Sequence, residues 1–388
     1  LAPASLFQKK NCSEAGSMNI ERVDIIHIRI PLVIPYETSY TPNKNVDKLI
    51  LKTYTPDAAV YSECVCKDRP DSTYETPQTV RAVLKEFLLP GIMKEELKGV
   101  DDYQARTAVI KGHNMAKAAV ENAVWAYEAS KQGISLSRLL GGVRTRVPVG
   151  MGIGIQADTD RLLKLVEEYL EAGFRRIKLK IKPGWDIIPL EAVRSVYPDL
   201  ELMVDANNAY AYPRDREALK ALDAFGLSML EQPLCYEDLH RHAKLQAEIS
   251  TPICLDESVT SPYQAKIAAE IGACRIINIK QGRVGGLGPS KAVHDIAREH
   301  GLTCWVGQMI ETGVGLNYGL AVAALDNCKH PNDTLPTRFY ASDDIISPRM
   351  ELNPDSTVDI PSGPGLGVKV DEQQLDRYTV AREVIRKQ

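Results

Sequence analysis

The run RRIKLKI at residues 175–181 is the first of five short apolar segments that each end in charged residues. The other four are LELMVDANN at 200–208, LSMLEQP at 227–233, PICLDES at 252–258 and CRIINIKQ at 274–281. From Lys180 onward, a charged residue recurs after 25, 26, 25 and 24 residues, at Asp205, Glu231, Asp256 and Lys280. Each interval suits one strand, one helix and their two loops. The pattern predicts buried parallel strands that each deliver one functional side chain.

The segments between these strands have the apolar spacing of amphipathic helices. They lie at 160–173, 189–197, 215–226, 236–249, 262–272 and 288–301, and several end in glycine, which commonly stops a helix. Further strands are expected to start near Val147 and Leu302, which gives at least seven in all. The predicted fold class is therefore α/β, a modified (β/α)8 TIM-type barrel. Catalytic residues of such barrels gather at the C-terminal ends of the strands.

Three of the recurring charges are carboxylates, Asp205, Glu231 and Asp256, which the barrel would bring to one mouth. Singly, such residues often only cap a helix or form a surface ion pair. Three carboxylates crowded together repel one another unless a cation lies among them. Oxygen ligands from separate strands suit a hard ion such as Mg²⁺. A softer metal is not expected, because the chain has neither a His-Glu-x-x-His sequence nor a zinc-knuckle cysteine spacing.

Lysines complete the predicted chemistry. Lys178 and Lys180 are two residues apart on one strand and so face the same side, and Lys280 follows a strand four units further round the barrel. A lysine that is partly desolvated near other cations can have its pKa lowered from about 10.4 toward neutrality, which makes it a usable general base. A base, a metal and an opposing cation suit removal of a proton α to a carboxylate, since an enediolate dianion must be neutralised as it forms.

At these residues the chain resembles the enolase superfamily, in its muconate-lactonizing-enzyme subgroup, and within it the o-succinylbenzoate synthase / N-succinylamino acid racemase family. The matching stretches run through most of residues 18–345. They are GHNMAKAAVENAVW at 112–125, RIKLKIKPGWD at 176–186, DANNAY at 205–210, EQPL at 231–234, LDESVTS at 255–261, INIKQGRVGGLG at 277–288 and MIETGVG at 309–315.

The resemblance implies one divalent ion, Mg²⁺ or Mn²⁺, held by Asp205, Glu231 and Asp256. It also implies Lys180 as the base on one face of the substrate and Lys280 on the other, and enolase-superfamily sites do pair a Lys base with Mg²⁺. Lys178 would support the charge and lower the pKa of Lys180. Asn207 is expected beside the metal ligands or in a strand-end hydrogen bond. Glu257 is expected to point away from the side of Asp256, as a structural partner.

The predicted substrate contacts are Ser39, Tyr40, Arg283, Gly285, Met309, Ile310 and Glu311. The segment 37–44 corresponds to the family's substrate-covering loop, and the glycines at 285–288 open a helix whose N–H groups could hold a carboxylate. Arg283 either tunes Lys280, as is typical of the racemising branch, or is an ordinary loop arginine. The chain departs from the family's usual sequence at Gln281 and at GQMIETG, 307–313. These departures leave open which substrate fits the site.

The family resemblance implies an o-succinylbenzoate synthase, which dehydrates 2-succinyl-6-hydroxy-2,4-cyclohexadiene-1-carboxylate through an enediolate in menaquinone biosynthesis. The alternative is N-succinylamino acid (N-acylamino acid) racemisation, as the main activity or a second activity of the same site. In that reaction one lysine removes the proton from one face and the other returns it to the opposite face. A dipeptide epimerase or cycloisomerase would keep the same charged residues. A barrel that only binds or scaffolds is disfavoured, because every expected ligand and both lysines are present.

Four regions are expected along the chain. Residues 1–17 are predicted to be a disordered or artificial leader, and 18–145 an α+β capping domain with strands at 31–40, 47–55 and 58–66 and helices at 79–92 and 115–130. The barrel, of the (β/α)7β type, would occupy 146–344. The C-terminal segment 345–388 would complete the cap.

Composition sets limits on the function. The chain has 388 residues, 44% hydrophobic and 25% charged, with a net charge of −4, as in an ordinary globular protein. Neither a basic patch nor excess positive charge suggests nucleic acid, and no apolar run is long enough to span a membrane. Eight scattered cysteines favour a reducing, cytoplasmic location. The expected partners are a small carboxylate substrate and further copies of the chain, as a homo-oligomer.

Overall fold

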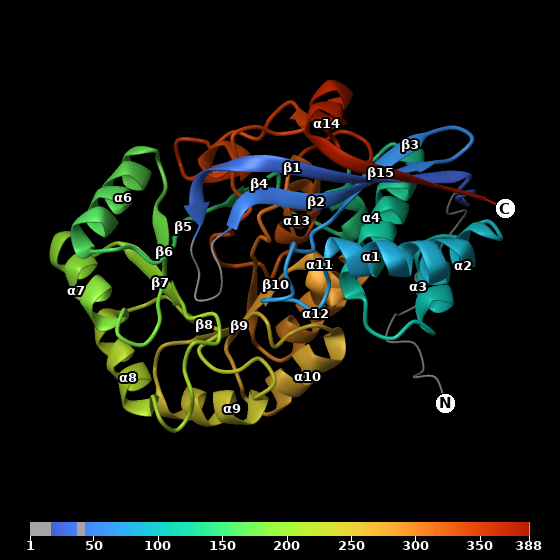
Figure 1. Ribbon diagram of the computed structural model, residues 1–388. Helices are drawn as coiled ribbons and strands as arrows, with labels where there is room; N and C mark the ends of the chain where they lie inside the picture. Colours follow the sequence, from blue (N-terminus) through green and yellow to red (C-terminus); the bar gives the residue numbers. More distant parts are fainter. Residues whose placement is uncertain (1–16, 37–42, 388) are drawn as a thin grey trace.

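A curled parallel sheet forms the centre of the computed structural model, which describes residues 17–36 and 43–387 (Figure 1). Its seven strands are ordered β11-β10-β9-β8-β7-β6-β5, and neighbouring strands pair in parallel. They are β5 (Met151–Ile153), β6 (Arg176–Lys180), β7 (Glu201–Asp205), β8 (Leu230–Glu231), β9 (Ile253–Leu255), β10 (Ile276–Ile279) and β11 (Thr303–Val306). The predicted succession of buried strands is confirmed.

Helices run along the outside of this sheet (Figure 1). They are α6 (Thr159–Glu171), α7 (Ile187–Val196), α8 (Arg216–Ala221) with the 3₁₀ turn η2 (Leu222–Phe225), α9 (Leu239–Glu248), α10 (Pro262–Glu270), α11 (Gln281–Val284), α12 (Leu287–Glu299) and α13 (Gly313–Ala323). Helix α6 shows why they form. Asp158 caps its start by accepting the Arg161 N–H, and Leu162, Leu165 and Val166 form its buried face. Gly173 follows its end with a φ of 104°.

An irregular segment, residues 328–334, closes the ring where an eighth strand would lie. On one side the Lys329 N–H donates to Cys304 O (2.9 Å) and the Asp333 N–H to Val306 O (2.9 Å). On the other side, Asn332 exchanges backbone hydrogen bonds with residues 148 and 150, of 2.8 and 2.9 Å. The fold is thus the modified TIM barrel that the sequence predicted, with an irregular closing segment.

The first barrel strand begins later than expected. The residues around Val147 do form a strand, β4 (Arg146–Pro148), but it pairs antiparallel with β13 (Thr357–Asp359) and not with the barrel. The barrel strand β5 follows at Met151. Counted from β5, Lys180 still lies on the second strand and Lys280 directly follows the sixth.

A four-stranded sheet, the cap sheet, lies across one end of the barrel (Figure 1). Its order is β15 (Thr379–Arg386), β1 (Arg22–Tyr36), β2 (Asn43–Tyr54), β3 (Ala59–Cys64). The first cap strand is expected at 31–40 but begins at Arg22, because the apolar run RVDIIHIRI already pairs with β15 and β2 from that residue. The last strand of the chain pairs antiparallel with β1. The C-terminal end of the chain therefore belongs to the cap sheet.

Helices complete the cap. They are α1 (Pro77–Val83), the π-helical turn η1 (Leu84–Leu88), α2 (Leu89–Met93), α3 (Val100–Thr107), α4 (Asn114–Lys131) and α5 (Leu136–Leu140). The helix expected over 79–92 is present as one continuous helical run from Pro77 to Met93, with the π-helical turn η1 in its middle. The remaining C-terminal elements are η3 (Thr337–Phe339), β12 (Ile346–Ser347), β14 (Lys369–Val370) and α14 (Glu372–Tyr378). Among the described helices, none combines the length and apolar character needed to cross a bilayer.

Two buried glutamates of the cap hold the start of two barrel helices. Glu63 of β3 accepts the Thr312 hydroxyl (2.6 Å) and the Gly315 N–H (2.8 Å) at the start of α13. Glu121 of α4 accepts the Gly288 N–H (3.2 Å) at the start of α12. Helix N-termini favour such acceptors. These bonds fix the cap against the barrel beside the C-terminal ends of the strands.

Replacing Glu121 with glutamine is expected to flatten the dependence of unfolding free energy on pH. Burial raises the pKa of Glu121 to about 7 from 4.5. Between these values the folded protein holds a proton that the unfolded chain lacks, so wild-type stability falls as pH rises, by up to about 1.4 kcal/mol per pH unit from this group. Urea unfolding at pH 5, 6 and 7 measures the slope. Glu299→Gln, at the exposed end of α12, should keep the wild-type slope; equal slopes for all three proteins would contradict the prediction.

Candidate active site

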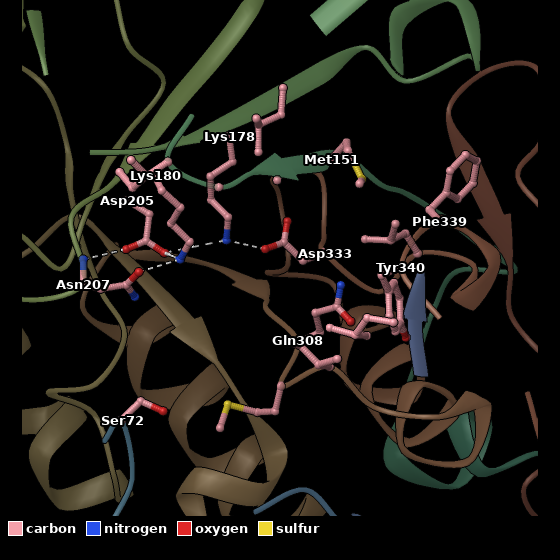
Figure 2. Close-up of a pocket in the computed structure, with 18 of the residues that line it drawn as sticks. Ser72, Met151, Lys178, Lys180, Asp205, Asn207, Gln308, Asp333, Phe339 and Tyr340 are labelled. Carbon is pink, nitrogen blue, oxygen red and sulfur yellow. Dashed lines mark hydrogen bonds and ion pairs between the residues drawn. The ribbon is translucent and has the colours of Figure 1, made fainter. Parts of the chain in front are cut away.

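A cavity of about 280 Å³ lies at the C-terminal ends of the barrel strands, and residues of the cap also line it (Figure 2). Nine of the side chains singled out from the sequence line it together. They are Lys178, Lys180, Asp205, Asn207, Glu257, Lys280, Arg283, Met309 and Ile310. They come from segments spread over more than a hundred residues, and the barrel brings them to one place.

Lys180 lies among oxygen acceptors at the end of β6. Its Nζ is 2.5 Å from Asp205 Oδ2 and donates to Asn207 Oδ1 at 2.7 Å (Figure 2). The side chain of Asn207 also donates to Glu257 Oε1 at 3.1 Å. Lys180 is only 7% exposed. It is therefore oriented by the carboxylate and the amide, and it faces the cavity.

Lys178 contacts an acid that sequence reasoning missed. Its Nζ forms an ion pair with Asp333 in the segment that closes the barrel (Figure 2), and lies 3.3 Å from Glu231 Oε2. Arg176 approaches the other oxygen of Asp333 at 2.8 Å. Burial acts to raise the pKa of Asp333, but the Lys178 and Arg176 charges outweigh it and lower that pKa to about 2. The segment has no apolar strand pattern that could have drawn attention to Asp333.

The two remaining predicted metal ligands lie beneath the cavity. Glu231 and Asp256 are fully buried. Burial, and then the charge of Asp205, raise the pKa of Glu231 to about 8, with a further contribution from Asp256. Asp256 pairs with Lys280 at 2.8 Å and with Arg283. Burial opposes these two cations, but they hold the pKa of Asp256 well below its usual value.

The chemistry of this donor set fits a hard divalent cation. Asp205 and Glu231 are paired directly across β7 and β8, and Asp256 follows the neighbouring β9. Burial is the largest cause of the raised pKa of Glu231, and the charges of Asp205 and Asp256 add a repulsion that a cation among the three would relieve. As the side chains stand, each of the three carboxylates is paired with lysine or arginine, and no group of three acidic, His or Cys side chains in the described ranges is arranged to hold an ion. Metal binding would therefore exchange some of these ion pairs.

The side chain of Glu257 lines the cavity and accepts from Asn207, whereas that of Asp256 is buried beneath the cavity. Strand β9 ends at Leu255, and the chain turns at 256–258, so the alternation of a strand no longer determines which way residue 257 points. Burial, and then the charge of Asp256, raise the pKa of Glu257 to about 7.

The loop after β11 is held in a strained conformation beside the cavity. Ile310 has a φ of 58°, which a β-branched residue rarely adopts. Glu311 lies behind it, where its carboxylate accepts the Met309 N–H at 2.7 Å and its carbonyl accepts the Tyr340 hydroxyl at 2.7 Å. Met309 and Ile310 thus face the cavity, whereas Glu311 supports the loop. Strain of this kind is concentrated at functional sites.

Gly285 does not line the cavity. The N–H groups of Gly285 and Gly286 both donate to Gln281 O, and that of Gly288 donates to Glu121. These donors have partners within the protein, so the structure does not favour the expected carboxylate site here. Ser39 and Tyr40 lie outside the described residues.

Sequence reasoning also missed one wall of the cavity. It is apolar and includes Met151, Leu165, Leu335, Phe339 and Tyr340. Lys67, Ser72 and Arg161 add polar groups from the cap and from α6. The cavity thus joins a charged floor to an apolar wall, which suits a carboxylate substrate with an apolar body.

The family of the chain follows from comparison with known proteins. Residues 22–141 match the mandelate racemase / muconate lactonizing enzyme N-terminal domain, and 161–374 match the enolase C-terminal domain-like family. An o-succinylbenzoate synthase of Geobacillus stearothermophilus is 42% identical over 364 residues, which cover 94% of this chain and 96% of that one. An N-succinylamino acid racemase of an Amycolatopsis species is 40% identical over 367 residues, 94% and 99% of the two chains. The chain belongs to the o-succinylbenzoate synthase / N-succinylamino acid racemase family of the enolase superfamily.

Solved structures agree with this membership. A crystal structure of an enolase-superfamily member from Listeria innocua superposes with a TM-score of 0.91, at 36% identity, and covers 96% of this chain and 100% of that one. Enzymes of this superfamily branch generally use Mg²⁺. The protein is thus an enzyme of the enolase superfamily, and its relatives include both lyases and isomerases.

Proposed function

We propose that this protein is an o-succinylbenzoate synthase, which dehydrates 2-succinyl-6-hydroxy-2,4-cyclohexadiene-1-carboxylate to o-succinylbenzoate in menaquinone biosynthesis. The observation that carries the proposal is the placement of Lys180 and Lys280 in one cavity, next to three carboxylates on adjacent strands. The high identity to synthases along almost the whole chain supports it.

In this proposal Asp205, Glu231 and Asp256 would hold one Mg²⁺ or Mn²⁺, and the bound ion would supply positive charge that offsets the charge of the enediolate. The neutral amine of Lys180 takes the proton α to that carboxylate. Lys280 stays charged and faces the dianion. The C–O bond to the ring hydroxyl then breaks, and the Lys180 ammonium returns its proton to the departing oxygen, so that water and the aromatic product leave.

N-succinylamino acid racemisation is the second candidate function. It is favoured by the contacts of Lys280, which shares Asp256 with the buried Arg283. Both cations thus lie on one carboxylate at the cavity, and racemisation requires Lys280 to exchange a proton as Lys180 does. Identity of 39–40% to racemases also supports it. Both reactions begin with the same proton abstraction.

The expected result is Mg²⁺-dependent formation of o-succinylbenzoate from the cyclohexadiene substrate, followed by ultraviolet absorbance. Removal of the metal with EDTA should stop turnover, and added Mg²⁺ should restore it. The same preparation is given N-succinyl-L-phenylalanine, and loss of optical rotation reports racemisation. A folded, Mg²⁺-loaded protein that racemises but does not dehydrate would overturn the synthase assignment in favour of the second candidate.

As part of the same proposal, we expect a small carboxylate substrate, a homo-oligomer and a reducing, cytoplasmic compartment. The seven cysteines in the described part of the chain are all free, and six of them are buried, which supports a reducing location.

A further inference from the structure

The cations that line the cavity differ in whether they form an ion pair with a carboxylate. Lys178, Lys180, Lys280 and Arg283 each pair with a carboxylate in the floor. Lys67, from the cap, pairs with Asp71 at 2.7 Å. Arg161 alone among these cavity-lining cations has no ion pair and no side-chain hydrogen bond to the residues that the structure describes.

The position of Arg161 on helix α6 directs it toward the cavity. Arg161, Leu165 and Tyr169 are spaced four residues apart and all three line the cavity, as expected for one face of a helix. The nearby Asp158 accepts the backbone N–H of Arg161 at 2.8 Å as the helix cap. Arg161 is exposed, whereas the catalytic lysines are buried, so its guanidinium lies at the solvent side of the cavity.

The two proposed substrates share a feature that matches this arrangement. In the cyclohexadiene substrate and in an N-succinylamino acid alike, the succinyl arm carries a second carboxylate, separated from the reacting carbon by the same number of bonds. One carboxylate must lie at the floor, where the proton is removed. The other then extends along the apolar wall toward the rim, where a guanidinium can hold it with two parallel hydrogen bonds.

We propose that Arg161 binds the second carboxylate of a dicarboxylate substrate and so selects N-succinyl over N-acetyl compounds. The inference rests on the proposed function for the identity of the ligand. It goes further in assigning the acyl-group specificity to one residue of α6. An N-acetyl compound lacks the second carboxylate and gains nothing from Arg161.

Binding to the Mg²⁺-loaded protein tests this separately from catalysis. The ligands are o-succinylbenzoate and 2-butanoylbenzoate, which has a methyl group in place of the second carboxylate, and isothermal titration gives their affinities. Wild type should prefer the dicarboxylate by about 10- to 100-fold, the range expected for hydrogen bonds between charged groups. Arg161→Gln should lose most of this preference, and Arg161→Lys should keep part of it. Lys164→Gln, a turn further along α6 and outside the cavity lining, should keep all of it.

Two results would overturn the inference. One is a wild type that binds both ligands equally or neither, and the other is an Arg161→Gln protein that keeps the full preference. The dehydration assay on the same wild-type preparation reports on the proposed function alone. A protein that prefers the dicarboxylate through Arg161 but catalyses neither dehydration nor racemisation would refute the proposed function and leave the carboxylate site standing.

Discussion

Lys180→Ala is expected to lower kcat for dehydration by at least about 1,000-fold, toward the upper end of the range for loss of a general base. The reason is that Lys180 acts twice in the proposed reaction, first as base and then as acid. Its Nζ is fixed by Asp205 and Asn207 and faces the cavity. Alanine leaves no group in that place that could accept the proton. The initial rate of o-succinylbenzoate formation at saturating substrate measures the effect.

Lys182→Ala is the matched control, because Lys182 follows on the same segment but does not line the cavity. It should leave kcat within about threefold of wild type, as is usual for a surface change. Far-ultraviolet circular dichroism checks that the Lys180→Ala protein is folded. An activity within tenfold of wild type in a folded Lys180→Ala protein would refute the assignment of the base.

The same substitution shows on which face of the substrate each lysine acts in the racemisation reaction. In deuterium oxide, Lys180→Ala should abolish exchange of the α-proton for one enantiomer of an N-succinylamino acid only. Lys280→Ala should abolish exchange for the other enantiomer. Proton NMR of each enantiomer gives the exchange rates. Loss of exchange for both enantiomers in either variant would show that the lysines do not act on opposite faces.

The barrel strands and their charges could be predicted because one rule governs them. A strand buried on both faces needs an apolar run, and the 25-residue interval repeats one strand and one helix. Lys180 pairs with Asp205, and Asp205 with Glu231, on neighbouring strands, so the nearly equal spacing in sequence corresponds to aligned positions in the sheet. The register follows from strand geometry, so no knowledge of the loops was needed.

The residues that sequence reasoning missed lie outside the barrel strands, where the repeat of apolar strand and helix gives no information. Asp333 belongs to the irregular closing segment, which has neither an apolar run nor a regular strand. In the sequence, Arg161 resembles any surface arginine of an amphipathic helix. Only the folded structure brings it beside the cavity. Each depends on contacts between distant segments, which sequence spacing does not encode.

Glu231→Gln is expected to remove most of the stabilisation of the protein by Mg²⁺. In wild type, saturating Mg²⁺ at a hundred times its Kd should add about 2.7 kcal/mol to the free energy of unfolding. Glutamine removes the negative charge at the centre of the three carboxylates, where the ion would gain most, and should weaken binding by about 100-fold or more, as expected for the loss of a ligand charge. Thermal unfolding of EDTA-treated protein, with and without added Mg²⁺, measures the gain.

Glu63→Gln provides an unusually close control. Glu63 is fully buried like Glu231, and burial likewise raises its pKa to about 8, but it caps α13 and is not one of the proposed metal ligands. Its substitution therefore removes a buried carboxyl group of the same kind from a different place, and the Mg²⁺-induced gain should persist. If Glu231→Gln keeps that gain, the ion binds elsewhere. If both variants lose it, the effect belongs to the packing of the cap on the barrel and not to coordination by Glu231.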